Sequence, residues 1–234
     1  HTYEPTPKQV AELERARLFF RIGVPFEDRL IEKLKNRFDS VQVVDTRQGI
    51  RLRPMTCEEE HDGPHDGHEH AAGRPDPHIW LDPKLVKIQA RTICDAMCRA
   101  DPTGAEVYRK NCDAFLADLD AVDARITRAL APLKGKEFFV YHPAFGYFGD
   151  SYGLRQVAVE TAGKEPDAKE LAALIDRAKA TGVKVIFVQP QFSARSARAV
   201  AEAIGGVVVP MDDLAKDYLK NLDDMAAKIE KAIR

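Results

Sequence analysis

Long apolar runs and an excess of charge of one sign are both missing from this 234-residue sequence. The longest apolar stretches, Val185–Val188 and Val207–Pro210, are strand-sized and fall far short of the ~20 residues that a membrane-spanning helix needs. The 35 basic and 37 acidic residues give a net charge of −2, without the positive surplus that nucleic-acid-binding proteins carry. We therefore expect a chain that neither spans a membrane nor binds nucleic acid.

Cysteine is also scarce, with four residues at Cys57, Cys94, Cys98 and Cys112. Four are too few for a disulfide scaffold, and none has the Cys-x-x-Cys spacing of zinc ribbons or thioredoxin-like sites. Cys94 and Cys98 lie one helical turn apart in an apolar-periodic run, where small thiols pack like hydrophobic side chains. The cysteines therefore predict buried thiols and leave the redox compartment open.

What is present is the alternation of strands and helices typical of an α/β protein. A strand at Leu18–Ile22, a helix at Pro25–Arg37 and a strand at Val41–Val44 form one βαβ unit. After Gly135 the alternation resumes through strands at 138–141, 157–160, 185–188 and 207–209 and helices at 144–152, 167–180, 193–204 and 214–233. This order predicts parallel sheets flanked by helices, with the strand carboxyl ends at one edge.

A long helical pattern separates these two alternations. Helix signals from Pro83 to Ala100 stop at Asp101-Pro102 and restart from Thr103 to Ala131, a length of roughly 45 Å at ~1.5 Å per residue. We interpret residues 1–101 as an N-terminal lobe, 102–134 as a rigid connecting helix and 135–234 as a C-terminal lobe. A single continuous helix predicts little movement of the lobes on ligand binding.

Histidine is concentrated in one place, because five of the seven lie between residues 61 and 78. Four of these belong to a Gly-, Asp- and Glu-rich segment at 58–74: His61, His65, His68 and His70. Imidazoles favour zinc, copper and nickel, but a segment without secondary structure must be ordered at an entropic cost before it can hold an ion. The segment predicts weak accessory metal binding, and an inert polar linker or tag is the alternative.

Other metal-ligating side chains lie at junctions between elements. His78 precedes a helix, His142 follows the strand at 138–141, and Asp212 follows the last strand. Taken singly, each has the ordinary interpretation of a helix cap or a satisfied buried histidine. Together with His1 they make a set of three nitrogens and one oxygen that suits zinc.

Four motifs occur in order along the chain: HTYEPTP at 1–7, DPHIWLDP at 76–83, YHPAFGYF at 141–148 and QPQFS at 189–193. With the histidine-rich segment between the first two, the sequence resembles the metal-specific solute-binding proteins of ABC transporters, in particular the high-affinity zinc receptors. The resemblance covers essentially all 234 residues.

This resemblance implies two α/β lobes joined by one long rigid helix, with Zn(II) held between them by His1, His78, His142 and Asp212. The family usually has Pro or a small residue after the ligand aspartate, so Asp213 leaves the choice between Asp212 and Asp213 open. The resemblance further implies a non-enzymatic monomer in the periplasm or on the extracytoplasmic membrane surface, which delivers zinc to an ABC permease.

The sequence departs from the family pattern at its start. Family members begin with a strand, a helix and another strand before the first ligand histidine, whereas this sequence begins at His1 without an initiator Met or an apolar leader. We therefore expect the first lobe to be truncated at its N-terminus, with any signal or lipid anchor upstream of His1.

Three alternatives remain. A manganese or iron receptor of the same family would carry a carboxylate at the position of His142, because harder ions prefer oxygen. A zinc hydrolase would need an open coordination position and a general base, and the His-Glu-x-x-His motif is absent. A metal buffer acting through residues 58–74 would lose all tight binding when that segment is deleted, whereas a receptor would keep one tightly bound ion.

Overall fold

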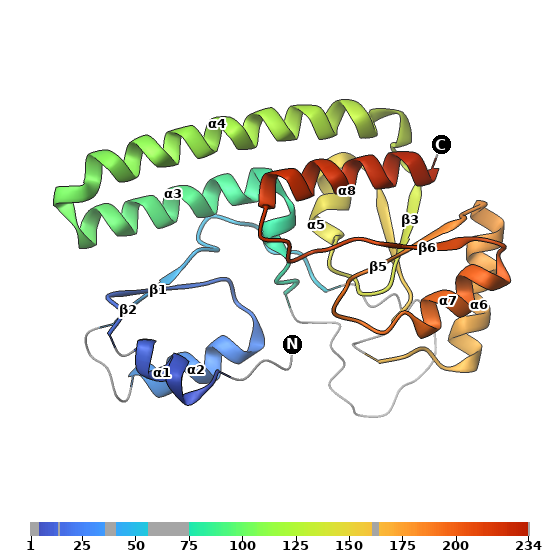
Figure 1. The fold of residues 1–234 in the computed structure, drawn as a ribbon, viewed down its shortest axis with the longest axis horizontal. Helices are drawn as coiled ribbons and strands as arrows, with labels where there is room; N and C mark the ends of the chain where they lie inside the picture. The colour runs from blue at the N-terminus through green and yellow to red at the C-terminus, as the bar shows by residue number, and fades with distance from the viewer. Residues whose placement is uncertain (1–4, 14, 36–40, 56–74, 161–163, 234) are drawn as a thin grey trace. The chain divides into compact units, whose positions relative to one another are not determined.

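The computed structural model describes residues 5–13, 15–35, 41–55, 75–160 and 164–233 (Figure 1). The chain divides into two compact units. Unit 1 comprises residues 1–51 and 83–120, and unit 2 comprises residues 52–82 and 121–234. Among the described residues, no helix combines the length and the apolar character that crossing a membrane requires.

Unit 1 contains the βαβ arrangement that the sequence predicts. Strand β1 (Leu18–Arg21) pairs in parallel with β2 (Gln42–Asp45), and helix α2 (Pro25–Lys35) connects them. Helix α1 (Pro7–Leu13) precedes β1. The predicted order of strand, helix and strand is confirmed here, although β1 ends one residue earlier than expected and β2 lies one residue later. The expected last two residues of the helix, 36–37, lie outside the described residues.

Two further helices continue unit 1. Helix α3 (Pro83–Ala100) is followed by a 3-10 turn at Pro102–Gly104 and by α4 (Ala105–Leu130). The Asp101 carboxylate accepts hydrogen bonds from the Thr103 hydroxyl (2.5 Å) and the Tyr108 hydroxyl (2.6 Å), which fixes this turn. The long helix expected over residues 103–131 is therefore present, and its last ten residues belong to unit 2.

Unit 2 is built on a four-stranded sheet that is parallel throughout and has the order β4-β3-β5-β6. Its strands are β3 (Glu137–Val140), β4 (Arg155–Ala158), β5 (Val185–Val188) and β6 (Val207–Pro210). Its helices include α5 (Gly146–Tyr152), α6 (Ala168–Thr181), α7 (Arg195–Ala203) and α8 (Tyr218–Ile233). This confirms the predicted order of elements after Gly135.

Both faces of this sheet are covered. Phe138, Val140 and Phe187 pack with residues of α5, α8 and the end of α4 in one apolar cluster. Phe139 and Ile186 point to the other face and pack with residues of α6 and α7, which lie together in Figure 1. Because strands buried on both faces need apolar residues at successive positions, they read as continuous apolar runs.

The segment before α3 packs within unit 2. A 3-10 turn at Ile79–Leu81 follows His78, and the Leu81 side chain is buried in the apolar cluster that also contains residues of α8. The Trp80 indole N–H donates to the Asp213 carbonyl (2.8 Å), and the Tyr218 hydroxyl donates to the Trp80 carbonyl (2.7 Å). These bonds hold His78 beside the turn between β6 and α8.

Candidate metal centre

Four polar residues follow the four strands of unit 2 at the carboxyl edge of the sheet. His142 follows β3, Glu160 follows β4, Gln189 follows β5 and Asp213 follows β6. In an open parallel sheet, ligands bind at this edge, because the loops after successive strands converge there. All four residues are buried.

The His142 ring is fixed from two sides. Its Nδ1 atom lies 2.6 Å from Glu160 Oε1, and its ring stacks on Phe192 with centroids 4.8 Å apart. The backbone is held as well, because the His142 N–H donates to Gln189 Oε1 (3.2 Å) and the Gln189 amide donates to the His142 carbonyl (2.9 Å). A carboxylate can only accept a hydrogen bond, so the proton lies on Nδ1 and the Nε2 lone pair faces away from Glu160.

His78 has an equivalent arrangement on a different part of the chain. Its Nδ1 atom lies 2.7 Å from Asp76 Oδ1, which also accepts the His78 backbone N–H at 3.0 Å. The Tyr147 hydroxyl donates to the Asp76 carbonyl (2.9 Å), and the Arg53 guanidinium lies 4.0 Å from Asp76 Oδ2. The His78 ring is therefore also held by a carboxylate, with its Nε2 lone pair directed elsewhere.

The two imidazoles meet edge to edge. The Nε2 atoms of His78 and His142 are 3.3 Å apart, and each residue is 3% exposed. The ring planes cross at 73°, so the two nitrogens approach from different directions. The pair therefore presents two nitrogen donors at one buried point.

Asp213 lies beside this pair, whereas Asp212 has other partners. Burial raises the pKa of the Asp213 carboxyl, and the nearby His78 and His142 act in the opposite direction. Asp213 Oδ1 is buried and has no hydrogen-bond partner among the described residues. Asp212 is half-buried, and its Oδ1 accepts from the Leu214 backbone N–H (2.9 Å) and the Gln191 amide (3.2 Å).

The described residues hold only part of the predicted ligand set. His1 and the accessory histidines lie outside them: His61, His65, His68 and His70. Within the described ranges, no group of three or more His, Cys, Asp or Glu side chains is already arranged to hold a metal ion. The structure thus brings together His78 and His142, with Asp213 as the neighbouring carboxylate.

The residues that orient the histidines are not marked by the metal-ligand pattern of the sequence. Asp76 was visible as the residue two positions before His78 in the DPHIWLDP motif, a spacing that lets one carboxylate reach both the backbone and the ring. Glu160 is 18 residues from His142, and Gln189 is 47 residues away. No local pattern marks these two, because they meet His142 only through the pairing of β3 with β4 and β5.

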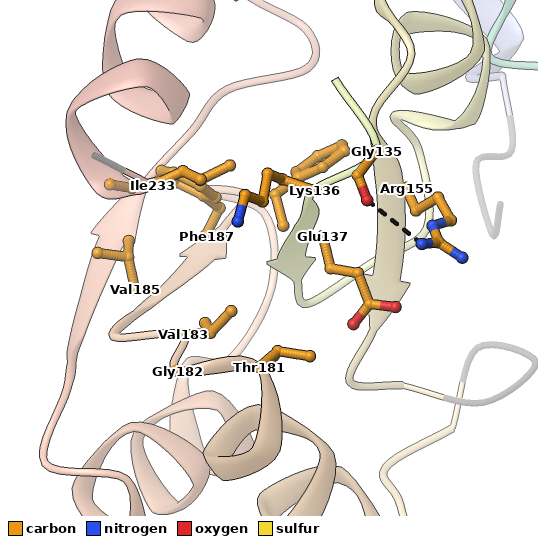
Figure 2. A pocket seen from close by; sticks show the side chains of 12 residues that line it. Gly135, Lys136, Glu137, Arg155, Thr181, Gly182, Val183, Val185, Phe187 and Ile233 are labelled. Atoms are coloured by element: carbon orange, nitrogen blue, oxygen red, sulfur yellow. Dashed lines mark hydrogen bonds between the residues drawn. The ribbon is translucent and has the colours of Figure 1, made fainter. Parts of the chain in front are cut away.

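A separate cavity of about 310 Å³ lies at the amino ends of β3 and β5, opposite the edge that carries His142 (Figure 2). Lys136, Glu137 and Arg155 line it, and the Arg155 guanidinium donates to the Gly135 carbonyl at 3.3 Å. The lining contains no histidine or cysteine. The cavity is therefore no part of the histidine site.

Comparisons with known proteins give one family. Residues 1–232 match the family described as ZnuA, zinc-uptake complex component A, periplasmic. The high-affinity zinc uptake system protein ZnuA of Bacillus subtilis is 33% identical over 223 residues, which cover 93% of this chain and 70% of that protein. The zinc-binding lipoprotein AdcA of Streptococcus pneumoniae is 29% identical over 243 residues, and the chain spans 48% of its length.

The fold agrees with these relatives. A crystal structure of a ZnuA deletion mutant with zinc bound is 39% identical, with a TM-score of 0.87 over 99% of this chain and 84% of that one. All three proteins are named for zinc uptake or zinc binding rather than for an enzymatic reaction, in agreement with the predicted non-enzymatic receptor. The chain is a member of the periplasmic zinc-uptake component A family, as its motifs indicated.

Proposed function

We propose that this chain captures Zn(II) outside the cytoplasm with His78, His142 and Asp213 and passes the ion to an ABC permease. The observation that carries the proposal is the 3.3 Å distance between the two Nε2 atoms. Tetrahedral zinc with Zn–N bonds of about 2.0–2.1 Å holds two nitrogen ligands about 3.3–3.4 Å apart. The two imidazoles therefore already have the spacing that zinc requires.

The carboxylates behind the rings support the same function. The Nδ1–H group of each ring donates a hydrogen bond to its carboxylate, Asp76 for His78 and Glu160 for His142, which fixes the tautomer with no proton on Nε2. Such pairs hold the orientation of the imidazole ring. Because the carboxylates are buried with their rings, the ligands need little rearrangement when the ion arrives.

Asp213 supplies the oxygen ligand in this proposal. A buried carboxylate oxygen without a donor is costly, and a cation beside it removes that cost. Asp212 already accepts two hydrogen bonds, which suits a residue that shapes the turn after β6. The proposed ligand set therefore contains Asp213 in place of Asp212.

The remaining expectations concern residues outside the described ranges. His1 as a further ligand, and with it the binding of zinc between two lobes, stays a prediction. The same holds for weak metal binding by residues 58–74. The family's name as a periplasmic uptake component supports the extracytoplasmic location and the transfer to a permease.

Competition titration of zinc against a chromogenic chelator at fixed pH tests the ligand set, because ligand deprotonation makes affinity pH-dependent. We expect His142→Ala to weaken zinc binding by more than about 100-fold, beyond the loss expected for an orienting residue. We expect Asp213→Asn to weaken binding by at least about 10-fold, while the matched control Asp212→Asn stays within about threefold. A larger loss in Asp212→Asn would assign the carboxylate ligand to Asp212.

Competition between zinc and manganese tests which ion the proposed site prefers. Nitrogen ligands favour zinc, and the general order of divalent affinities also puts zinc above manganese. We expect the unmodified chain to prefer zinc, and His142→Glu to narrow that preference. Equal or tighter manganese binding by the unmodified chain would contradict the zinc assignment.

A further inference from the structure

Three of the four cysteines of the chain gather in unit 1, between α3 and α4. Cys94 and Cys98 are on α3, and Cys112 is on α4. Cys94 is buried, and the other two are half-buried. The metal site proposed above uses none of them, and all three are free thiols in this structure.

The hydrogen bonds of the outer thiols show how they are spaced. Cys112 Sγ lies 3.7 Å from the carbonyl oxygen of Ala90, one turn before Cys94 on α3. Cys98 Sγ lies 3.7 Å from the carbonyl oxygen of Ala105, the first residue of α4. Each of these two thiols therefore contacts the facing helix. Cys94 lies between Ala90 and Cys98 along α3.

The Cys94 thiol interacts with both neighbours. Burial raises its pKa to about 12, and the Cys112 and Cys98 thiols act in the same direction, with Cys112 the stronger. Cys94 is therefore a protonated, buried thiol, and the half-buried Cys112 thiol reaches the turn of α3 that precedes it.

Helix geometry decides which two sulfurs can join. Cys94 and Cys98 are four residues apart on one helix, where Cβ atoms are ≈ 5–6 Å apart, and a disulfide needs about 3.5–4.5 Å. Cys98 contacts α4 at Ala105, which is seven residues or about 10 Å along the helix from Cys112. The pair on facing helices, Cys94 and Cys112, is the one that the packing favours.

We propose that Cys94 and Cys112 form a reversible disulfide that joins α3 to α4, made by exchange with an external disulfide. This goes beyond the proposed zinc function and shares with it only the extracytoplasmic location, where such bonds form and persist. The oxidant is a small-molecule or protein disulfide of the compartment. The bond is a covalent modification of unit 1 that leaves the histidine site unchanged.

The exchange has two steps, in which atoms and electrons balance. The Cys112 thiolate, which is the more accessible, attacks one sulfur of the external disulfide, forms a mixed disulfide and releases one external thiolate. The Cys94 thiolate then attacks the Cys112 sulfur and releases the second external thiolate. Two electrons pass from the cysteine pair to the external disulfide, and the two cysteine protons end on the two released thiols.

Peptide mapping by mass spectrometry tests the linkage in the full chain after equilibration with reduced and oxidised glutathione and quenching of free thiols. We expect a cross-linked peptide pair containing Cys94 and Cys112, with Cys57 and Cys98 blocked by the quenching reagent. Free Cys94 and Cys112 at every glutathione ratio would overturn the proposal, and so would a bond of either residue to Cys57 or Cys98.

Thermal unfolding of the same samples gives the second measurement. The bond closes a loop of about 18 residues, so we expect oxidation to raise the Tm of the unit 1 transition by about 10–25 °C. Cys112→Ala should abolish this shift, and the matched control Cys98→Ala should keep it. Loss of the shift in Cys98→Ala alone would overturn the pairing. Zinc affinity measured on these samples reports separately on the proposed function.

Discussion

Strands β3 and β5 of unit 2 are buried at three of their four residues, whereas β1 of unit 1 is only half-buried along its whole length. Of the described histidines, His142 follows β3, and His78 packs against His142. A ligand pair whose nitrogens must be held at a fixed distance needs a stiff support, which a sheet packed on both faces provides. The proposed metal site therefore lies in the unit with the more deeply buried strands, while Cys94, Cys98 and Cys112 lie in the other unit.

The largest expected difference between the units is in the cost of removing an aromatic ring. Phe148 is fully buried and packs edge-on against Tyr152, with ring centroids 4.8 Å apart. We expect Phe148→Ala to lower the free energy of unfolding of unit 2 by about 3–5 kcal/mol. The same change at half-buried Phe19 of β1 should lower that of unit 1 by about 1–2 kcal/mol.

Native-state hydrogen exchange is the suitable measurement, because a chain of two units does not unfold in a single two-state transition. The amides of each unit report the free energy of unfolding of that unit separately. In the unmodified chain, the amides of β3 and β5 should exchange more slowly than those of β1 and β2. Equal protection in both sheets, or equal losses in the two variants, would remove the contrast.

A smaller effect is expected from the carboxylate that orients His142. Glu160→Gln keeps the shape of the side chain but weakens its hold on the Nδ1 proton, so we expect zinc affinity to fall by about 10–100-fold. Glu165→Gln is the matched control, because the exposed Glu165 carboxylate accepts from the Tyr141 hydroxyl (3.2 Å) and does not touch His142 in a described contact. Chelator competition measures both, and equal losses would show that general destabilisation, rather than the orientation of His142, is responsible.

The smallest expected effect is a loss of stability at low pH, and it concerns unit 1. Hydrogen bonds from Thr103 and Tyr108 lower the pKa of Asp101 to about 2. Since the folded pKa is below the unfolded value, the stabilisation is present above about pH 4 and is lost as the pH falls through about 2. An NMR titration of the Asp101 carboxyl checks the pKa, and Asp101→Asn should remove this part of the acid sensitivity. A midpoint near 4 would contradict the bonded carboxylate.

The order of the elements could be predicted from the sequence because apolar periodicity and turn residues are local signals. The helix at Pro83–Ala100 and the strand at Val185–Val188 have the predicted limits. The helix predicted from Leu214 begins at Tyr218 instead, because the residues after β6 form a turn in which Asp212 accepts the Leu214 N–H. Periodicity does not reveal such a side-chain bond in advance.

Pairings across the sheet could not be predicted in this way. Glu160 meets His142 because β4 lies next to β3 in register, and Gln189 meets it because β5 lies on the other side. Likewise, the assignment of Leu52–Asp82 to the unit that contains the C-terminal sheet depends on contacts such as that of Trp80 with Asp213. These partners are distant in sequence, so their meeting depends on topology.

The sequence by itself determined the family, the succession of strands and helices, and the positions of His78 and His142, because each depends on residue types at short spacing. Only the tertiary structure decided that the two Nε2 atoms lie 3.3 Å apart, that Asp213 rather than Asp212 has its carboxylate buried beside them, and that Cys94 faces Cys112. The physical reason is that distances between side chains from different elements are set by sheet register and helix packing, which the whole chain fixes together.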